Sequence, residues 1–358
     1  MSKKQSKKSA LSIARGIQSP PAVNPNRKKI ERKHLTVNQY VEGIIRGNRT
    51  VLSQAITLIE SNLSQHIEKA QEIIKLCLPH AGKSIRVGIT GIPGVGKSSF
   101  IEALGIQLTA ENHRLAVLAI DPSSERSKGS ILGDKTRMEI LSASPNAFIR
   151  PSPSAGTLGG VARKTRESIL LCEAAGFDII FVETVGVGQS EIAVHSMVDF
   201  FLLLILAGAG DELQGIKRGI MEMADMLAIT KADGVNEENA KRAAAEYASA
   251  LHLFPPGDSG WIPEVHTCSA HRNKGIKELW KKILEYQKLT VKNGYFADRR
   301  KRQSLYWMDE TIMESLKNRF YQDVKVHEML ERLKKDVLED KVSSFVAAQQ
   351  VMAYYFSK

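Results

Sequence analysis

The sequence predicts an α/β fold built on a mostly parallel sheet, with helices added before and after it. Three observations indicate this fold. First, a glycine-rich loop lies between an apolar run and a helical pattern. Second, further short apolar runs each end in polar residues. Third, apolar residues recur at helical spacing both before and after this region of predicted strands. At 358 residues, of which 43% are hydrophobic, the chain can form one α/β domain with substantial additions.

The stretch GIPGVGKS, residues 91–98, fits the G-x-x-x-x-G-K-[ST] phosphate loop without a mismatch. Residues 85–90 before it are predicted to form a buried strand, and residues 99–108 after it a helix. Glycines let backbone N–H groups turn toward phosphate oxygens at a helix start. Lys97 is expected to meet the β- and γ-phosphates, and Ser98 to bind Mg²⁺. The candidate phosphate-site residues are Gly91, Gly94, Val95, Gly96, Lys97, Ser98 and Ser99.

The formal charge of +11 lies mostly in the first 33 residues, which hold seven Lys, three Arg and one acidic residue. The rest of the chain is nearly neutral, which argues against a nucleic-acid partner. Residues 1–34 are rich in Lys, Ser, Pro and Asn and are predicted to be disordered. They lack the apolar core of a secretory signal, but their low acidic content leaves a mitochondrial targeting segment open.

Cys77, Cys172 and Cys268 are far apart in the sequence, without metal-ligand spacing. They predict buried free thiols in a reducing compartment. The longest apolar run, residues 200–207, is too short to cross a bilayer and predicts a central strand instead. We therefore expect a cytoplasmic protein without a membrane partner, with the mitochondrial matrix as the alternative.

Helical periodicity before the phosphate loop predicts three helical segments between residues 35 and 80. Beyond the loop, five apolar runs predict further strands, at residues 115–120, 147–150, 177–182, 199–206 and 226–230. A helix is predicted at residues 159–175, and such alternation is typical of a parallel sheet. The polar segment at residues 125–138 lacks an apolar period, which predicts a functional loop.

A second nucleotide element follows the predicted strand at residues 177–182. Glu183 comes directly after this strand, and Gly186 follows three residues later. A carboxylate at this place can reach Mg²⁺, often through water, and a glycine N–H can sense the γ-phosphate. We therefore expect Glu183 and Gly186 to act beside the phosphate loop.

The segment Thr230-Lys231-Ala-Asp233 follows another strand and predicts a base site. The Asp233 carboxylate can accept hydrogen bonds from guanine N1–H and the 2-amino group together, a donor pair that adenine lacks. Lys231 is expected to lie along the base plane. Ser269 and Ala270, at the next strand end, can offer backbone N–H groups to the base carbonyl.

The chain is predicted to end in helices. One helix is expected at residues 273–290, and a charged helical region runs from residue 298 to the end. Its apolar residues recur in steps of three and four: Leu305, Met308, Ile312, Leu316 and Phe320; Met329, Leu333 and Val337; Phe345, Ala348, Met352 and Tyr355. Such a pattern predicts an apolar stripe that packs either within the chain or against a partner.

Four long motifs make the sequence similar to the GTPase family associated with adenosylcobalamin-dependent methylmalonyl-CoA mutase. They are GITGIPGVGKSS, DPSS followed by GSILGDKTRM, FVETVGVGQSE, and AGAGDELQGIKRGIMEMAD. The family includes the human protein of methylmalonic aciduria type A and proteins labelled arginine/ornithine transport kinases. The resemblance covers about residues 35–358, and the last motif corresponds to an additional switch absent from Ras-like proteins.

The resemblance implies a SIMIBI-class P-loop GTPase domain flanked by N-terminal helices and a C-terminal helical arm that forms a homodimer. The regions expected on this basis are a tail at 1–34, a helical extension at 35–82, the GTPase domain at 83–290 and the arm at 291–358. The implied activity is Mg²⁺-dependent hydrolysis of GTP to GDP and phosphate. The implied partner is an adenosylcobalamin-dependent acyl-CoA mutase, whose cofactor loading, protection or reactivation the chain would gate.

The resemblance also assigns roles to single residues. The implied phosphate, metal and γ-phosphate residues are Lys97, Ser98, Asp121, Asp134 and Glu183. The implied mutase-responsive residues are Asp211, Gln214 and Lys217. The chain departs from the family pattern in two places. Thr230 stands where many members have Asn, so one side-chain amide contact to the base or phosphate loop is missing. Either the hydroxyl replaces that contact or guanine affinity is lower. Lys128 stands where Gly is common, which bears on the flexibility expected of the first switch loop.

Two other functions are compatible with a phosphate loop. A small-molecule kinase needs an acceptor pocket and a base near the γ-phosphate, and Asp121 or Glu183 would have to serve as that base. A GTPase associated with a ribonucleoprotein is suggested only by the basic tail. The guanine-nucleotide switch that binds a cobalamin enzyme is therefore the favoured hypothesis.

Overall fold

The computed structural model describes residues 35–120, 138–151, 158–184, 190–207, 218–255 and 257–357. Residues Val37–Lys358 form one compact unit. The region boundaries expected near residues 82 and 290 fall inside this unit and stay predictions. Within the described ranges, no helix combines the length and apolar character needed to cross a membrane.

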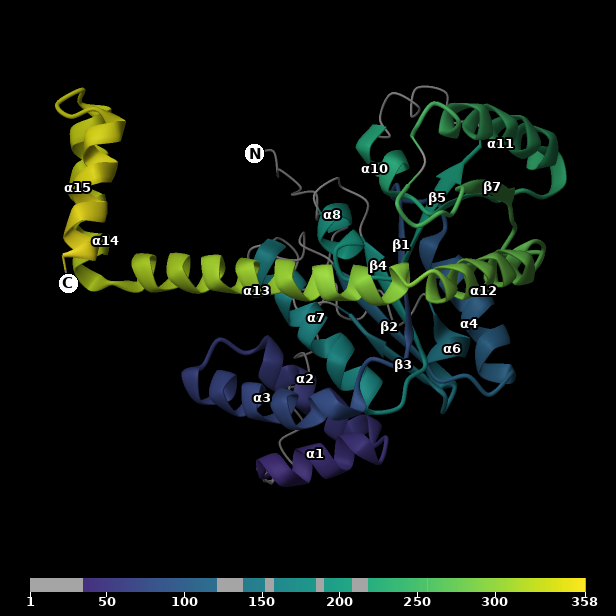
Figure 1. The fold of residues 1–358 in the computed structure, drawn as a ribbon, viewed down its shortest axis with the longest axis horizontal. Helices are drawn as coiled ribbons and strands as arrows, with labels where there is room; N and C mark the ends of the chain where they lie inside the picture. The colour runs from purple at the N-terminus through teal and green to yellow at the C-terminus, as the bar shows by residue number, and fades with distance from the viewer. Residues whose placement is uncertain are drawn as a thin grey trace, which may run out of the picture. The chain divides into compact units, whose positions relative to one another are not determined.

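A seven-stranded sheet forms the centre of the described structure (Figure 1). Its strands are β1 (Ile85–Gly91), β2 (Leu115–Ile120), β3 (Ala147–Arg150), β4 (Ile179–Thr184), β5 (Phe200–Leu206), β6 (Met226–Thr230) and β7 (Glu264–Thr267). They lie in the order β3-β2-β4-β1-β5-β6-β7, and every pairing is parallel. The prediction of a mostly parallel sheet is confirmed. All strands therefore end at one edge, where the phosphate loop begins.

The strand predicted at residues 177–182 is displaced in the structure. It forms β4 at Ile179–Thr184, so Glu183 lies inside the strand instead of after it. Pairing with β1 and β2 extends β4 beyond its apolar run, and Glu183 pairs in register with Ile89 of β1. This pairing holds the carboxylate next to the strand that enters the phosphate loop.

Alternate residues of the strands face two different apolar clusters, as the period of two in a β-strand requires. One set, including Val87 and Phe181, packs with α4 (Lys97–Ala110) and α12 (Ile276–Lys292). The other set on β5 and β6 packs with α10 (Arg218–Met223) and α11 (Glu237–Leu251). The remaining helices of this region are α6 (Glu139–Ala143), α7 (Leu158–Ala174) and α8 (Ser190–His195).

Helix α11 has no counterpart among the sequence predictions. Its buried face is made of Ala240, Tyr247 and Leu251, with small alanines between them. Alanine gives only a weak apolar signal, so no clear stripe marks this helix in the sequence. Two acidic residues in its first turn, Glu237 and Glu238, were the available signal, because they favour a helix start.

The three helices predicted before the phosphate loop are confirmed as α1 (Val37–Ile45), α2 (Arg49–Glu60) and α3 (Ser64–Cys77). Helices α2 and α3 pack on α7. The carbonyl of Glu60 accepts a hydrogen bond from the buried Lys164 Nζ over 2.7 Å, and its carboxylate pairs with Arg150. These contacts attach the N-terminal helices to α7 and to strand β3.

The chain ends in three helices: α13 (Tyr295–Gln322), α14 (Val324–Leu338) and α15 (Ser344–Phe356). The start of α13 is fixed to the turn before β5. Arg300 Nη2 of α13 pairs with Asp199 over 2.6 Å. Further along α13, Gln303 Nε2 donates to the Val198 carbonyl over 2.8 Å. Trp307 Nε1 donates to the Ser196 carbonyl over 3.0 Å. The first part of the arm is therefore anchored on the body of the protein.

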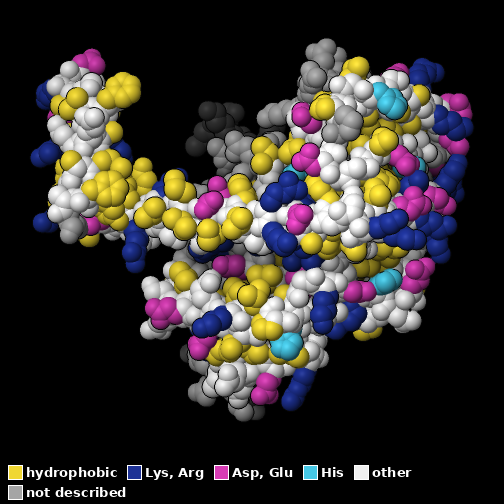
Figure 2. All heavy atoms as spheres, viewed as in Figure 1, with side chains coloured by type: hydrophobic (Ala, Val, Ile, Leu, Met, Phe, Trp, Pro, Cys, Tyr) yellow, Lys and Arg dark blue, Asp and Glu magenta, His cyan; other side chains and the backbone are white. Residues whose placement is uncertain are grey.

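The predicted apolar stripes of the arm divide into two classes. The stripe on α14, centred on Leu333, packs within the chain against Ala347 and Val351 of α15. The stripe on α13 stays exposed, with Ile312 at 49% and Leu316 at 53% exposure. Figure 2 shows hydrophobic side chains along this helix. Packing within the chain is thus confirmed for α14, whereas packing of the α13 stripe against a partner stays a prediction. The stripe predicted on α15 is displaced by one position, because Ala347 and Val351 are its buried residues and Phe345 is 82% exposed.

Candidate nucleotide site

The phosphate loop has the backbone conformation that its glycines predict. Gly91, Gly94 and Gly96 have φ angles of +149°, +81° and +102°, a region that side chains with a Cβ disfavour. A Cβ on Gly91 would also lie 2.5 Å from the carbonyl oxygen of Leu204 on β5. Gly96 is the N-cap of α4, so the loop delivers the chain directly into a helix N-terminus. A helix N-terminus with free N–H groups is a ready site for phosphate.

The Lys97 side chain folds back over the loop. Its Nζ donates to the carbonyl oxygens of Gly91 over 2.6 Å and Ile92 over 3.1 Å, and the residue is 8% exposed. Val95 is fully buried beneath the loop, whereas Ser99 is exposed on α4. The ammonium therefore lies at the loop itself, where phosphate charge would be neutralised.

Ser98 and Glu183 meet at the carboxyl edge of the sheet. Ser98 Oγ donates to Glu183 Oε1 over 3.2 Å, although the two residues are 85 positions apart. Behind them, Thr184 Oγ1 donates to Thr90 Oγ1 over 2.8 Å within the buried strands. A hydroxyl and a carboxylate are oxygen ligands of the kind Mg²⁺ prefers. The pair fits a Mg²⁺ site, and no group of three or more His, Cys, Asp or Glu at metal-binding positions occurs in the described residues.

The base-side residues also come together. Ser269 Oγ donates to Asp233 Oδ2 and accepts from the Arg272 backbone N–H over 3.1 Å. Ala270, which follows Ser269, accepts from the Asn273 backbone N–H over 3.2 Å. The carboxylate is thus oriented from the next strand end, which is the arrangement expected for selection of guanine.

Lys231 lies between Thr230 and Asp233 in an unusual backbone conformation. Its φ is +54°, and its side chain is exposed. Asn236 Nδ2 donates to the Lys231 carbonyl over 3.0 Å and holds the turn. A positive φ in a residue other than glycine or Asn is uncommon and often marks a functional turn. Asn236 is therefore a supporting residue that the sequence reasoning missed.

The Thr230 hydroxyl makes a contact with the phosphate loop, as expected if it replaces the missing amide. Its Oγ1 donates to the Val95 carbonyl over 2.7 Å and lies 3.2 Å from the Ile205 carbonyl. The hydroxyl therefore joins the base strand to the phosphate loop in place of an amide.

Several predicted site residues lie outside the described residues. They are Asp121, Lys128, Asp134, Gly186, Asp211, Gln214 and Lys217. Their roles stay predictions. The described members of the site all lie at the carboxyl edge of the sheet, at the ends of β1, β4, β6 and β7.

The sheet is parallel, and a glycine phosphate loop follows β1. An acidic residue lies at the end of β4, and an aspartate-serine pair follows β6 and β7. Together these features define a P-loop nucleotide-binding protein of the GTPase class. Residues 52–325 match the family model described as methylmalonyl Co-A mutase-associated GTPase MeaB. The chain belongs to this family.

Individual relatives agree with this assignment. A probable GTPase of Mycobacterium tuberculosis is 47% identical over 317 residues, covering 88% of this chain and 94% of that protein. The mitochondrial methylmalonic aciduria type A homolog of Mus musculus is 45% identical, covering 92% of this chain and 81% of that protein. A crystal structure of LAO/AO transport system kinase has a TM-score of 0.71 at 35% identity, covering 89% of this chain and 97% of that chain. The chain is a GTPase, and GTP and GDP are its nucleotides.

Proposed function

We propose that the chain is a GTP-hydrolysing chaperone that binds an adenosylcobalamin-dependent acyl-CoA mutase, with methylmalonyl-CoA mutase as the partner. In this role it gates loading, protection or reactivation of the mutase cofactor. The family description names association with that mutase, and the mouse relative carries the name of a methylmalonic aciduria protein. The three buried free thiols fit a reducing compartment, for which we propose the bacterial cytoplasm, with the mitochondrial matrix as the alternative.

The contact between Ser98 and Glu183 is the observation that carries the hydrolytic part of the proposal. It supplies two of the groups that would hold Mg²⁺, and Asp121 and Asp134 are proposed to complete the acidic set. Bound Mg²⁺ would neutralise charge on the β- and γ-phosphate oxygens. Lys97 would move from the Gly91 and Ile92 carbonyls to the bridging region and stabilise the charge that grows as the β–γ bond breaks.

Recognition of guanine would depend on Asp233. Its carboxylate is oriented by Ser269 and would accept from N1–H and the 2-amino group, while Lys231 would cover the base. The Ala270 backbone N–H is proposed to face the base carbonyl. The same role expected for the Ser269 N–H is wrong, because that group donates to the Lys274 carbonyl over 2.9 Å. Gly186 is proposed to report the presence of the γ-phosphate through its N–H.

Coupling to the mutase is proposed to depend on Asp211, Gln214 and Lys217. The described residues before and after the segment that contains Asp211, Gln214 and Lys217 support this proposal. β5 ends at Leu206 beside β1, with Leu204 paired to Gly91, and α10 begins at Arg218. The segment therefore starts at the phosphate loop, where a partner that bound it would meet the nucleotide.

We also propose that the exposed stripe of α13 forms a homodimer interface. Leu305, Met308, Ile312 and Leu316 are each about half exposed on one helix, at 49–60%. Exposed apolar stripes of this length usually mark an interaction surface.

Light scattering should show that the unmodified chain is a dimer. The double variant Ile312→Glu, Leu316→Glu should be a monomer. Lys317→Glu on the same helix is the matched control, and a double variant that stays dimeric would exclude this stripe as the interface.

The partner proposal is tested by affinity capture. The full chain is incubated with purified methylmalonyl-CoA mutase in the presence of GDP or a non-hydrolysable GTP analogue. Retention of the mutase should differ between the two nucleotides, and Lys97→Ala should lose that difference. A mutase without cobalamin dependence is the control. If the cobalamin mutase is not retained with either nucleotide, the chaperone proposal is wrong, although the GTPase assignment stands.

A further inference from the structure

The loop between β7 and α12 closes on itself at its base. The Ser269 N–H donates to the Lys274 carbonyl over 2.9 Å, and the Lys274 N–H donates to the Ser269 carbonyl over 3.0 Å. Gly275 follows with a φ of +76°, and a Cβ there would lie 2.4 Å from the Thr267 carbonyl oxygen. Backbone contacts therefore fix both ends of the loop tip, residues 270–273.

Two backbone donors of the loop tip stay free. The Arg272 N–H donates to Ser269 Oγ over 3.1 Å. The Asn273 N–H donates to the Ala270 carbonyl over 3.2 Å. Within the described structure, the N–H groups of Ala270 and His271 have no acceptor. The tip thus presents two adjacent donors, of which the Ala270 N–H is proposed to face the base carbonyl.

Gln107 contacts the loop tip from α4. Its Nε2 donates to Asn273 Oδ1 over 2.5 Å, across 166 positions of sequence. Asn273 has a φ of +53°, a left-handed conformation that asparagine tolerates better than most residues. In the part of the chain that the structure describes, this is the one hydrogen bond that reaches residues 270–273 from outside the loop. The position of the free donors therefore depends on Gln107.

Gln107 belongs to the helix that starts at the phosphate loop. Helix α4 begins at Lys97, and Gln107 lies in its last turn. At a rise of about 1.5 Å per residue, the two are about 15 Å apart along the helix axis. Phe100, Leu104 and Leu108 of α4 are buried in the core against the sheet. Helix α4 can therefore act as a rigid spacer between the phosphate loop and the loop tip.

We propose that Gln107 is a positioning residue for guanine recognition, which holds the loop tip so that the Ala270 N–H meets the guanine 6-oxo group. The inference rests on the proposed base site and deepens it, because it assigns base selectivity to a residue of the phosphate helix. Asp233 would accept from the donors at N1 and the 2-amino group, whereas Gln107 would act on recognition of the acceptor at the 6-position.

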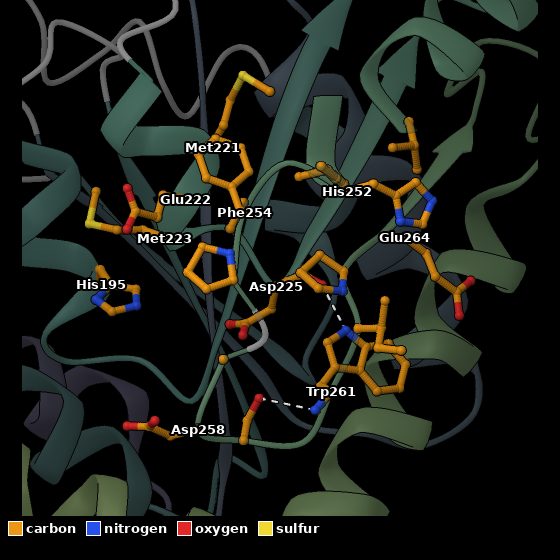
Figure 3. A pocket seen from close by; sticks show the side chains of 18 of the residues that line it. His195, Met221, Glu222, Met223, Asp225, His252, Phe254, Asp258, Trp261 and Glu264 are labelled. Carbon is orange, nitrogen blue, oxygen red and sulfur yellow. Dashed lines mark hydrogen bonds between the residues drawn. The ribbon is translucent and has the colours of Figure 1, made fainter. Parts of the chain in front are cut away.

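The opposite end of β6 is held by different contacts. Figure 3 shows Asp225 and Trp261 beside a cavity, and Trp261 Nε1 donates to the Asp225 carbonyl over 2.8 Å. Asp225 precedes β6, and Thr230 ends this strand. At a usual rise of about 3.3 Å per residue, the two are about 16 Å apart. His252 also lines this cavity, so His252→Gln is a control variant remote from the loop tip.

The test compares GDP with 6-thio-GDP, which keeps both donors but carries sulfur, a weak acceptor, at the 6-position. Competition against a fluorescent GDP analogue gives both dissociation constants for the full chain. Gln107→Leu keeps the size of the side chain but removes its donor. It should weaken GDP about 2- to 10-fold and 6-thio-GDP by less than about twofold. A purely structural role of Gln107 would weaken both nucleotides equally.

Asn273→Gly removes the acceptor of Gln107, while glycine allows the same φ. It should reproduce the effect of Gln107→Leu, and the double variant should bind GDP no more weakly than either single variant. Lys277→Ala is the matched control, because it breaks the neighbouring contact of 3.3 Å between α12 and Glu111 at the end of α4. Lys277→Ala and His252→Gln should bind both nucleotides as the unmodified chain does.

Unchanged GDP affinity in Gln107→Leu, or an equal loss for GDP and 6-thio-GDP, would overturn the proposal. Additive losses in the double variant would overturn it as well, because Gln107 and Asn273 would then act independently. An unmodified chain that bound ADP as tightly as GDP would instead refute guanine selection by Asp233, and the proposed base site with it.

Discussion

The hydroxyl of Thr230 donates to the Val95 carbonyl over 2.7 Å. This bond connects the strand that leads to the proposed base-recognition residues with the phosphate loop, across 135 positions of sequence. Because Thr230 is only 5% exposed, the bond is protected from water. The proposed base site and the phosphate loop are therefore joined by one buried hydrogen bond.

Thr230→Val should weaken GDP binding about 2- to 10-fold, since a buried hydrogen bond contributes a net ~0.5–1.5 kcal/mol. Thr230→Asn should retain the affinity, because its amide can donate to the same carbonyl. The dissociation constant of a fluorescent GDP analogue measures both. Thr57→Val, an exposed threonine of α2, is the control. Unchanged affinity in Thr230→Val would show that the Val95 contact does not support the loop.

Lys97→Ala should lower GTP turnover by about 10²–10³-fold or more, because it removes a preorganised positive charge at the breaking bond. The fold should persist, because Gly91, Gly94 and Gly96 set the backbone conformation of the loop. Phosphate release measures turnover, and circular dichroism checks the fold. Lys83→Ala, an exposed lysine before β1, should behave normally. Near-normal turnover of Lys97→Ala would refute its assignment.

Asp233→Asn should reduce GTP affinity and raise the relative affinity for XTP, whose 2-oxo group accepts from an amide. Loss of the charge-assisted pair should cost about 1.5–3 kcal/mol of binding free energy. Competition against fluorescent GDP gives the ratio of the two affinities. Asp298→Asn, exposed in the first turn of α13, serves as control. If the unmodified chain bound ATP and GTP equally, Asp233 would not be selecting guanine.

Lys217→Ala should leave basal hydrolysis and GDP affinity nearly unchanged but reduce the stimulation of hydrolysis by a cobalamin mutase. We expect this because Lys217 is proposed to respond to the docked mutase and to take no part in GDP binding or basal hydrolysis. GTP turnover with and without the mutase measures the effect, with the exposed Lys281→Ala as control. A mutant stimulated as strongly as the unmodified chain would exclude Lys217 as the coupling residue.

His195 should make stability depend on pH. Burial, together with the nearby Arg299 charge, lowers the pKa of His195 to about 4 from its ordinary 6.5. At a pH between these two pKa values, His195 is protonated in the unfolded chain but not in the folded chain. Stability is therefore full above about pH 6.5 and is lost as the pH falls, by about 2 kcal/mol between pH 7 and pH 5.

Denaturant unfolding at pH 7 and pH 5 measures this loss. His195→Gln should be less sensitive to the change than the unmodified chain, because glutamine does not titrate. His252→Gln, an exposed histidine, is the control. An equal loss of stability in His195→Gln and in the unmodified chain would contradict the assignment.

The sequence by itself determined the local parts of this protein. The loop from Gly91 to Ser98 could be predicted because its function depends on backbone angles that only neighbouring glycines allow. The helices α1, α2 and α3 were predictable because their buried residues repeat at helical spacing. The same patterns could not reveal α11, whose buried face consists largely of alanine.

Only the tertiary structure decided which distant residues meet. The order of the parallel strands brings Glu183 to Ser98 and Thr230 to Val95, and no local pattern contains that order. It also decided that the stripe of α14 packs within the chain while Ile312 and Leu316 of α13 stay exposed. The physical reason is that periodicity shows which residues of a helix or strand share a face, whereas the contacts of that face depend on the packing of the whole chain.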